Sequence, residues 1–409
     1  MPCDAAGAYP LELLKIAYAG DSIDLRVPAG CVRELSSSAP VSPSRAEEII
    51  PVDGVRRCLR RDTLVIVNDG TRPTPTRTIF DLLRPACDVL VATGAHAAPT
   101  EAELALLFGS HLQRLRPGIH DARRSPCRDL GVTSRGTPVR LNASLFDHER
   151  ILVIGSVEPH YFAGYTGGRK ALLPGVAAYD TIEANHALYF EPGVEILRLA
   201  GNPVHEDMVE AVDMLDVEVH CLNTVVVADG ALVAAFFGDI RRTLLQAADV
   251  ARGCFSAAIE ERADLVIACA PFPMDADLYQ SHKALVNAAR ACKPGGVIVL
   301  VSACRNGIGP RAFYDLTLAQ GSVEKAAAYA KAHYELGYHK VASFAEILAR
   351  HAVKAITGLP AEILRPLEME SWEPKDLERA VTAVHEGAGT ILYMPKASVT
   401  VPVLMEEAP

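Results

Sequence analysis

The sequence predicts an α/β fold built from two domains. Short runs rich in β-branched residues alternate with stretches of helical periodicity, which is the pattern of strands joined by crossover helices. At 409 residues the chain exceeds the size at which one hydrophobic core usually keeps growing. We therefore expect one α/β domain over residues 1–257 and a second over residues 258–395, with a tail of about residues 396–409 that can return to the first.

Three buried strands are expected in the first domain, and polar residues follow each of them. Prolines after the first strand suit the opening turn of a helix, and Thr100 with Glu103 forms a capping box that begins another. The expected strands are residues 63–68, 89–93 and 151–156. Because open α/β sheets bind ligands at the carboxyl ends of their strands, the polar residues that follow are expected to converge.

Farther along, an Asp-Gly pair at residues 229–230 separates two apolar runs and indicates a hairpin between residues 217–227 and 232–237. The second domain follows the same alternation of strands and helices. Its expected elements are strands at 264–270 and 297–302, helices at 281–292, 322–334, 342–356 and 375–386, and an apolar run at 391–394 in the part of the chain that can return to the first domain.

Composition excludes several classes of protein. The net charge is −10 and no basic run is present, so we expect no nucleic-acid partner. The ten cysteines include no Cys-x-x-Cys pair, which argues against a zinc ribbon or a disulfide framework and fits a reducing compartment. No stretch reaches the roughly eighteen apolar residues that span a bilayer, and the first residues do not resemble a signal peptide. We expect a soluble, cytoplasmic protein with no membrane partner.

The segment from His160 to Lys170 (HYFAGYTGGRK) is the most informative part of the chain, and Asn185-His186 follows it. Its glycines permit positive φ and close approach to a bound group. The lysine can hold an anion, pair with an acid or act as a nucleophile. The histidines can transfer protons near neutral pH or bind a metal. Neither a Walker A loop, a GxGxxG dinucleotide motif nor an HExxH zinc motif is present.

Three other clusters carry a weaker signal. Arg72, in the Asp69-Gly-Thr71-Arg72-Pro turn, can bind a carboxylate or phosphate with its planar fork, although an ordinary polar turn explains the segment better when it is taken alone. His96 is a candidate site residue only because it is predicted to lie at the same sheet edge as Arg72 and His160. Residues 277–283 offer amide, hydroxyl and ammonium donors near a helix start, with Gln280 or Ser281 as the cap, and form either an anion site or a plain helix N-terminus.

Together these clusters resemble the nickel-dependent lactate racemase family of 2-hydroxyacid racemases and epimerases. The resemblance rests on the order of the motifs along most of the chain and on the sixteen-residue step from Lys170 to His186. It implies a nickel-pincer nucleotide, that is, pyridinium-3,5-bisthiocarboxylic acid mononucleotide nickel. By resemblance, Lys170 forms the covalent tether and His186 binds the nickel. The resemblance also implies cofactor contacts from the following residues: Asp69, Thr71, Gly167, Gly168 and Arg169.

The implied reaction inverts C2 of a 2-hydroxyacid through proton-coupled hydride transfer to and from the cofactor, with a 2-oxoacid intermediate. By resemblance, His96 and His160 are the acid–base pair, one for each face of the substrate, and Asp69 orients a neighbouring group. The implied substrate contacts come from both domains, with the active site in the cleft between them. They are Arg72 for the carboxylate, and Tyr279, Gln280, Ser281 and Lys283 from the second domain.

The resemblance leaves other matters open. Enzymes of cofactor synthesis are expected as transient partners, and lactate, malate, longer aliphatic, aromatic and sugar acids are all open as substrates. His282 is expected to face solvent. The alternatives are a cofactor-free lyase or hydrolase that uses Lys170, a non-catalytic hydroxyacid-binding homologue, and a methyltransferase. The methyltransferase alternative rests only on the turn at residues 293–296. No glycine-rich S-adenosylmethionine loop precedes that turn, which argues against this alternative.

Overall fold

The structure, a computed structural model, describes residues 9–37, 45–227 and 230–407. The chain divides into a central unit, residues 39–255, and a terminal unit, residues 1–38 and 256–409. Each unit is built on a sheet covered by helices, and the predicted α/β class is confirmed. None of the helices in the described ranges combines the length and the apolar character that a membrane crossing requires.

The central unit contains a six-stranded sheet in the order β13-β12-β9-β4-β5-β6. All neighbouring strands are parallel except β12 and β13, which form the expected antiparallel pair. Asp229, predicted in the turn between them, lies outside the described residues. The strands are β4 (Thr63–Asn68), β5 (Asp88–Ala92), β6 (Gly118–Ile119), β9 (Arg150–Ser156), β12 (Glu218–Val226) and β13 (Leu232–Asp239).

Parallel register places the loops that follow the central strands at one edge of this sheet. Asn68 pairs with Ala92, and Val67 pairs with Ile154. The strands are almost wholly buried, as expected for a parallel sheet covered by other elements. Smaller pairs are β7 (Cys127–Val132) with β8 (Pro138–Asn142), and β10 (Pro159–His160) with β11 (Gly164–Tyr165).

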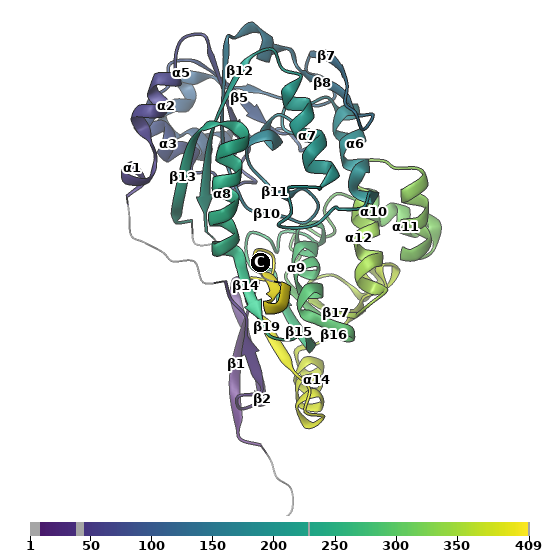
Figure 1. The fold of residues 1–409 in the computed structure, drawn as a ribbon. Helices are drawn as coiled ribbons and strands as arrows, with labels where there is room; N and C mark the ends of the chain where they lie inside the picture. The colour runs from purple at the N-terminus through teal and green to yellow at the C-terminus, as the bar shows by residue number, and fades with distance from the viewer. Residues whose placement is uncertain (1–8, 38–44, 228–229, 408–409) are drawn as a thin grey trace, which may run out of the picture. The chain divides into compact units, whose positions relative to one another are not determined.

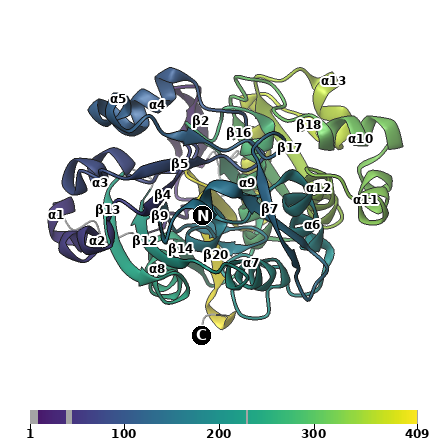
Figure 2. The ribbon, with the colours of Figure 1, turned by 90° about the horizontal axis from the view of Figure 1, so that it is seen from above.

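Several helices of the central unit lie against the sheet (Figures 1 and 2). Helices α2, α3 and α4 bury apolar side chains in the core that the sheet forms. Phe80 of α3 and Phe108 of α4 are buried against valines of β4 and β5. The predicted capping box of Thr100 and Glu103 opens α4. The helices are α1 (Ala46–Ile49), α2 (Val52–Cys58), α3 (Thr76–Leu83), α4 (Glu101–Phe108), α5 (Leu112–Leu115), α6 (Tyr179–Ala187), α7 (Pro203–Asp213) and α8 (Ile240–Phe255).

The terminal unit contains a second six-stranded sheet, in the order β18-β17-β16-β15-β19-β3, and all its neighbours are parallel. The hairpin of β1 and β2 packs on this sheet together with α14. The strands of the unit are β1 (Leu11–Tyr18), β2 (Asp21–Pro28), β3 (Val32–Glu34), β14 (Ser256–Ile259), β15 (Ala263–Cys269), β16 (Cys292–Ser302), β17 (Ala352–Thr357), β18 (Glu370–Ser371), β19 (Ile391–Met394) and β20 (Val401–Leu404).

Helices of the terminal unit include a group, α10 to α12, whose members lie side by side (Figure 2). Helix α9 packs on β15 and β16 and carries the residues expected to bind substrate. The helices are α9 (Leu278–Ala291), α10 (Ala312–Gln320), α11 (Val323–Ala332), α12 (His339–Leu348), α13 (Ala361–Leu364) and α14 (Pro374–Glu386).

Two expectations about the terminal unit differ from the structure. The helix predicted over 342–356 ends at Leu348, and Ala352–Thr357 forms β17 because it pairs in register with β16. A strand partner thus overrides the local helical pattern. Both ends of the chain also belong to the terminal unit. Strand β3 pairs with β19, and β20 pairs with β14, so the described residues 9–37 and the described part of the tail belong to the terminal unit and not to the first domain.

Candidate active site

The loops after β4 and β5 meet through Asp69 and His96. Oδ2 of Asp69 lies 2.7 Å from Nδ1 of His96. The other carboxylate oxygen accepts hydrogen bonds from the backbone N–H and the hydroxyl of Thr71. Asp69 is buried, whereas the His96 side chain is 54% exposed. The expected convergence of these two loops is therefore observed, and a buried acid holds a half-exposed imidazole.

Electrostatics keep Asp69 ionised. Burial by itself raises the pKa of this carboxyl, but the hydrogen bond and charge of His96 and the hydrogen bonds from Thr71 outweigh burial and lower the pKa below its usual value. An ionised carboxylate only accepts hydrogen bonds, so Nδ1 of His96 carries the shared proton. The imidazole therefore has Nε2 available to exchange a proton.

The loop after β9 depends on its glycines. Gly167 has a φ of +85°, and a β-carbon there would lie 2.4 Å from Cγ2 of Val157. The next glycine, Gly168, donates its N–H to Oδ1 of Asn223 over 2.9 Å and begins the short 3₁₀ helix η3 (Gly168–Ala171). This tight turn places Lys170 inside the unit, where the residue is only 9% exposed.

The aromatic ring of Phe162 contacts three of the predicted site residues. Its centroid lies 4.5 Å from that of the His160 ring and 5.1 Å from that of the His186 ring. The ammonium nitrogen of Lys170 lies 5.4 Å from the same centroid. His160 is the last residue of β10, and His186 lies in the last turn of α6. The structure therefore brings together the three residues expected at the tether, the metal and the acid–base position.

Burial shifts the titration of Lys170 and His186 in the same direction. Burial first, and then the positive charges of Arg72 and Arg169, hold the pKa of Lys170 well below its ordinary value. Burial, and then the charge of Lys170, lower the pKa of His186 to about 3. The lowered pKa makes the Lys170 amine easier to deprotonate to its nucleophilic form, and the neutral imidazole of His186 is the form that binds metals. Arg72, in the loop after β4, thus acts electrostatically on Lys170.

Arg169 makes its hydrogen bonds within the same loop. Its guanidinium donates to the carbonyl oxygens of Ala163, Thr166 and Gly167, and its Nε–H donates to Nδ1 of His205 at 3.0 Å. Burial lowers the pKa of Arg169 to about 9. These contacts show that Arg169 holds the loop in shape, whereas a cofactor contact from this side chain stays a prediction.

The remaining predicted residues lie on α9 of the terminal unit. The helix is capped by Asp277, whose side chain accepts from the N–H of Gln280, so neither predicted cap residue serves as the cap. Ser281 is buried, and its hydroxyl bonds to that of Ser302 at 2.7 Å. Nζ of Lys283 donates to Oε1 of Gln280 at 3.0 Å.

His282, expected at the surface, is fully buried. Its Nδ1 lies 3.3 Å from Nζ of Lys340, and its ring contacts Phe344. The ammonium nitrogen of Lys340 also lies 4.3 Å from the ring centroid of Tyr279. The expectation for His282 was wrong because the apolar side of α12 covers this position.

Sequence reasoning missed Asn202, His205 and Asp207 at the start of α7. Asn202 caps the helix and Pro203 occupies its first turn. That Asn-Pro pair is a readable signal of a helix start. It does not reveal that the side chains point toward the site.

Comparisons with known proteins assign the family. The model of the lactate racemase N-terminal domain matches residues 50–196, and that of the lactate racemase C-terminal domain matches residues 259–401. The chain belongs to the lactate racemase family. A lactate racemase of Thermoanaerobacterium thermosaccharolyticum is 32% identical over 269 residues, a match that spans 62% of this chain and 63% of that protein. The lactate racemase of Lactiplantibacillus plantarum is 26% identical over 388 residues, 88% of this chain and 90% of that one.

Solved structures of similar fold support the assignment of the α/β architecture. The lactate racemase apoprotein from T. thermosaccharolyticum superposes with a TM-score of 0.84 at 24% identity, over 96% of this chain and all of that one. A protein from Thermotoga maritima superposes with a TM-score of 0.70 at 16% identity, over 90% of this chain and all of that one. The expected enzyme class, an isomerase of racemase type, is the class of both curated relatives.

Proposed function

We propose that this member of the lactate racemase family is a 2-hydroxyacid racemase or epimerase that carries a nickel-pincer nucleotide on Lys170. The observation that carries the proposal is the gathering of Lys170, His160 and His186 around the ring of Phe162. The Asp69–His96 pair at the same sheet edge supplies a second oriented imidazole.

The residues present fit the cofactor. Lys170 is a buried amine with a lowered pKa, suited to forming a covalent bond, and His186 is a buried neutral imidazole, suited to a nickel ligand. Beside it, Oδ1 of Asn185 is buried and has no hydrogen-bond partner among the described residues. Within the described ranges, no cluster of three or more His, Cys, Asp or Glu side chains is arranged to hold a metal alone. When bound, the cofactor supplies nickel and a ring that accepts and returns hydride.

Two imidazoles suit a reaction that inverts one carbon centre, because a proton must be handled on either face of the substrate. His96 has its Nδ1–H held by Asp69, so Nε2 exchanges the hydroxyl proton. Nδ1 of His160 accepts the N–H of Ala163 at 3.3 Å, which supports a role for its Nε2 in proton exchange as well. Each turnover in either direction uses one imidazole as base and the other as acid.

The substrate carboxylate needs cationic ligands. Arg72, which follows Asp69 in the loop after β4, is a planar donor suited to a carboxylate. Lys283, Gln280, Tyr279 and Ser281 of the terminal unit are the remaining predicted ligands of the 2-hydroxyacid. Of these, Ser281 already bonds to Ser302, so its hydroxyl contributes by holding α9 in place.

The test is peptide-level mass spectrometry on protein co-expressed with nickel-pincer synthesis enzymes, the expected transient partners, together with its nickel content. Wild-type protein should carry a mononucleotide-sized adduct on Lys170 and about one nickel per chain, and Lys170→Ala should carry neither. Chiral analysis of lactate and other 2-hydroxyacids then identifies what is inverted. If a known family member is modified in the same cells and this chain is not, the proposal fails, and a cofactor-free enzyme that uses the Lys170 amine becomes the better reading.

A further inference from the structure

The first turns of α7 contact every segment that carries a residue grouped around Phe162. Asn202 is fully buried and caps the helix, with Oδ1 accepting the N–H of Val204 at 3.1 Å. Its amide nitrogen donates to the carbonyl oxygen of Phe162 at 2.9 Å. One side chain thus fixes the start of α7 and the backbone of the residue whose ring touches His160, His186 and Lys170.

His205, one turn along α7, holds the glycine-rich loop. Its Nδ1 accepts the Nε–H of Arg169 at 3.0 Å, and the same guanidinium donates to three carbonyl oxygens of the loop. Burial, and then the charge of Arg169, lower the pKa of His205 to about 3. The imidazole therefore stays neutral at ordinary pH and keeps a lone pair for Arg169, the residue before Lys170.

Asp207 holds the segment that carries His186. Its carboxylate is fully buried and accepts the Nδ2–H of Asn185 at 2.8 Å, next to hydrogen bonds from the hydroxyls of Thr133 and Thr137. Asn185 directly precedes His186 in α6, and its amide also donates to the carbonyl oxygen of Val204 in α7. Buried carboxylates with several donors form rigid networks, so the last turn of α6 is fixed to α7.

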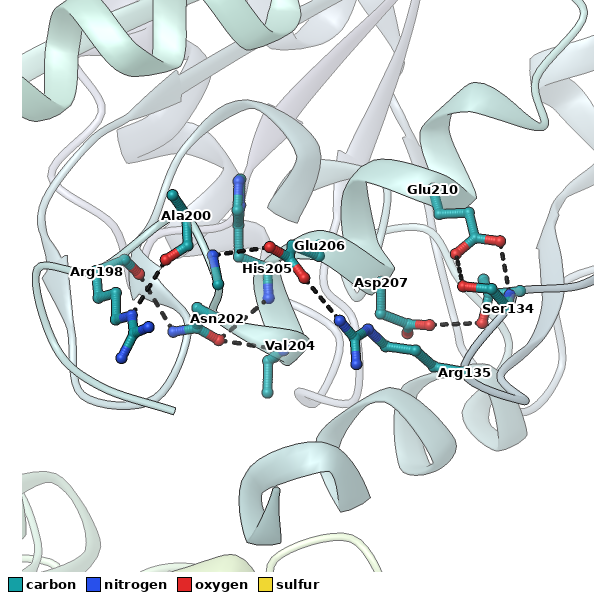
Figure 3. A network of polar contacts seen from close by, with 12 residues as sticks. Ser134, Arg135, Arg198, Ala200, Asn202, Val204, His205, Glu206, Asp207 and Glu210 are labelled. Carbon is teal, nitrogen blue, oxygen red and sulfur yellow. Dashed lines mark hydrogen bonds and ion pairs between the residues drawn. The ribbon is translucent and has the colours of Figure 1, made fainter. Parts of the chain in front are cut away.

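The same helix provides its own control. Glu206 forms an ion pair with Arg135 and also accepts the N–H of Gly201, whereas Glu210 lies beside Ser134 (Figure 3). Carboxylate oxygens of Glu210 accept the N–H and the hydroxyl of Ser134 at 2.6 Å. A substitution at Glu210 therefore removes polar contacts of α7 without touching the loops that carry His160, Lys170 or His186.

We propose that Asn202, His205 and Asp207 are positioning residues that hold His160, Lys170 and His186 in one arrangement before the cofactor is attached. The proposal rests on the proposed function for its catalytic meaning. It concerns residues that act through Phe162, Arg169 and Asn185, and it predicts that loosening α7 contacts affects cofactor retention and turnover more than substrate binding. Active sites built on rigid supports lose rate when the support is loosened by even a fraction of an ångström.

The first experiment uses the cofactor-free chain and hydrogen exchange of residues 164–172. His205→Leu removes the acceptor for Arg169, His205→Gln restores one, and Glu210→Gln is the matched control. Amides of this loop, such as those of Thr166 and Lys170, should exchange about tenfold faster in His205→Leu, because a charge-assisted hydrogen bond is lost next to them. They should stay near the wild-type rate in the other two variants. Equal exchange in His205→Leu and Glu210→Gln would overturn the proposal.

The second experiment uses the loaded protein. His205→Leu and Asp207→Asn should lose nickel faster than wild type and lower kcat about tenfold, with KM for the 2-hydroxyacid within about twofold, because neither residue contacts Arg72. His205→Gln should recover kcat. If His205→Leu or Asp207→Asn changes KM alone, or if His205→Gln does not recover kcat, the positioning role of α7 is refuted. If wild type carries no adduct, the proposed function fails, and the hydrogen-exchange result still decides whether α7 holds the loops.

Discussion

Replacement of Gly167 by Ala tests the physical account of the loop that carries Lys170. The backbone at Gly167 has a φ of +85°, and a β-carbon there would lie 2.4 Å from Cγ2 of Val157 and 2.9 Å from Oδ1 of Asn223. Gly136 is the matched control, since it has a φ of +88° and nothing lies within 4 Å of a β-carbon built there. Both substitutions place alanine in left-handed backbone, at about 1–2 kcal/mol. Only Gly167→Ala also overpacks the core, at about 1–3 kcal/mol more.

We therefore expect Gly136→Ala to lower the free energy of unfolding of the central unit by about 1–2 kcal/mol and Gly167→Ala to lower it by about 2–5 kcal/mol. Urea denaturation of the cofactor-free protein, followed by far-ultraviolet circular dichroism, measures both. Gly167→Ala should also impair attachment of the cofactor, because the carbonyl oxygen of Gly167 accepts the N–H of Lys170 at 3.0 Å. Equal losses of stability in the two variants would refute the steric argument.

Further outcomes are expected at the candidate site and in its support. Asp69→Asn should lower kcat roughly 100-fold, because His96 loses the carboxylate that orients it; initial rates in both directions measure this, and an unchanged kcat would remove the orienting role. His186→Ala should reduce bound nickel but retain the Lys170 adduct, as metal analysis and mass spectrometry of one sample would reveal. In the unfolded chain, His205 binds a proton below about pH 6.5. In the folded protein it binds that proton only near its lowered pKa of about 3. The free energy of unfolding should thus decrease as the pH is lowered below 6.5, by up to about 1.4 kcal/mol per pH unit from this group. His205→Gln should reduce this dependence, as urea titrations at pH 7 and 4.5 measure.

The sequence revealed β4, β5 and β9 of the central sheet to within a residue, because each is a short apolar run that polar residues follow. It did not indicate the short strand β6 or the pair β7 and β8. It also indicated that the loops that carry Asp69 and His96 would share one sheet edge, since parallel strands end at one edge of a sheet. It did not reveal that the described residues 9–37 belong to the terminal unit. Their strand β3 is three residues long, and its partner β19 lies more than 350 residues away in the chain. Such pairing leaves no local pattern.

By itself, the sequence determined the α/β class, the family and the residue types of the site, because motif order and periodicity are local properties of the chain. Only the tertiary structure decided which site residues have shifted pKa values and which side chains are held in place by hydrogen bonds. Burial, together with the charges of Arg72 and Arg169, lowers the pKa of Lys170, and those charges come from different loops. The support from Asn202, His205 and Asp207 likewise depends on α7 packing beside loops 20 to 40 residues earlier in the chain. Desolvation and long-range hydrogen bonds arise only when the chain is folded, so residue order alone does not specify them.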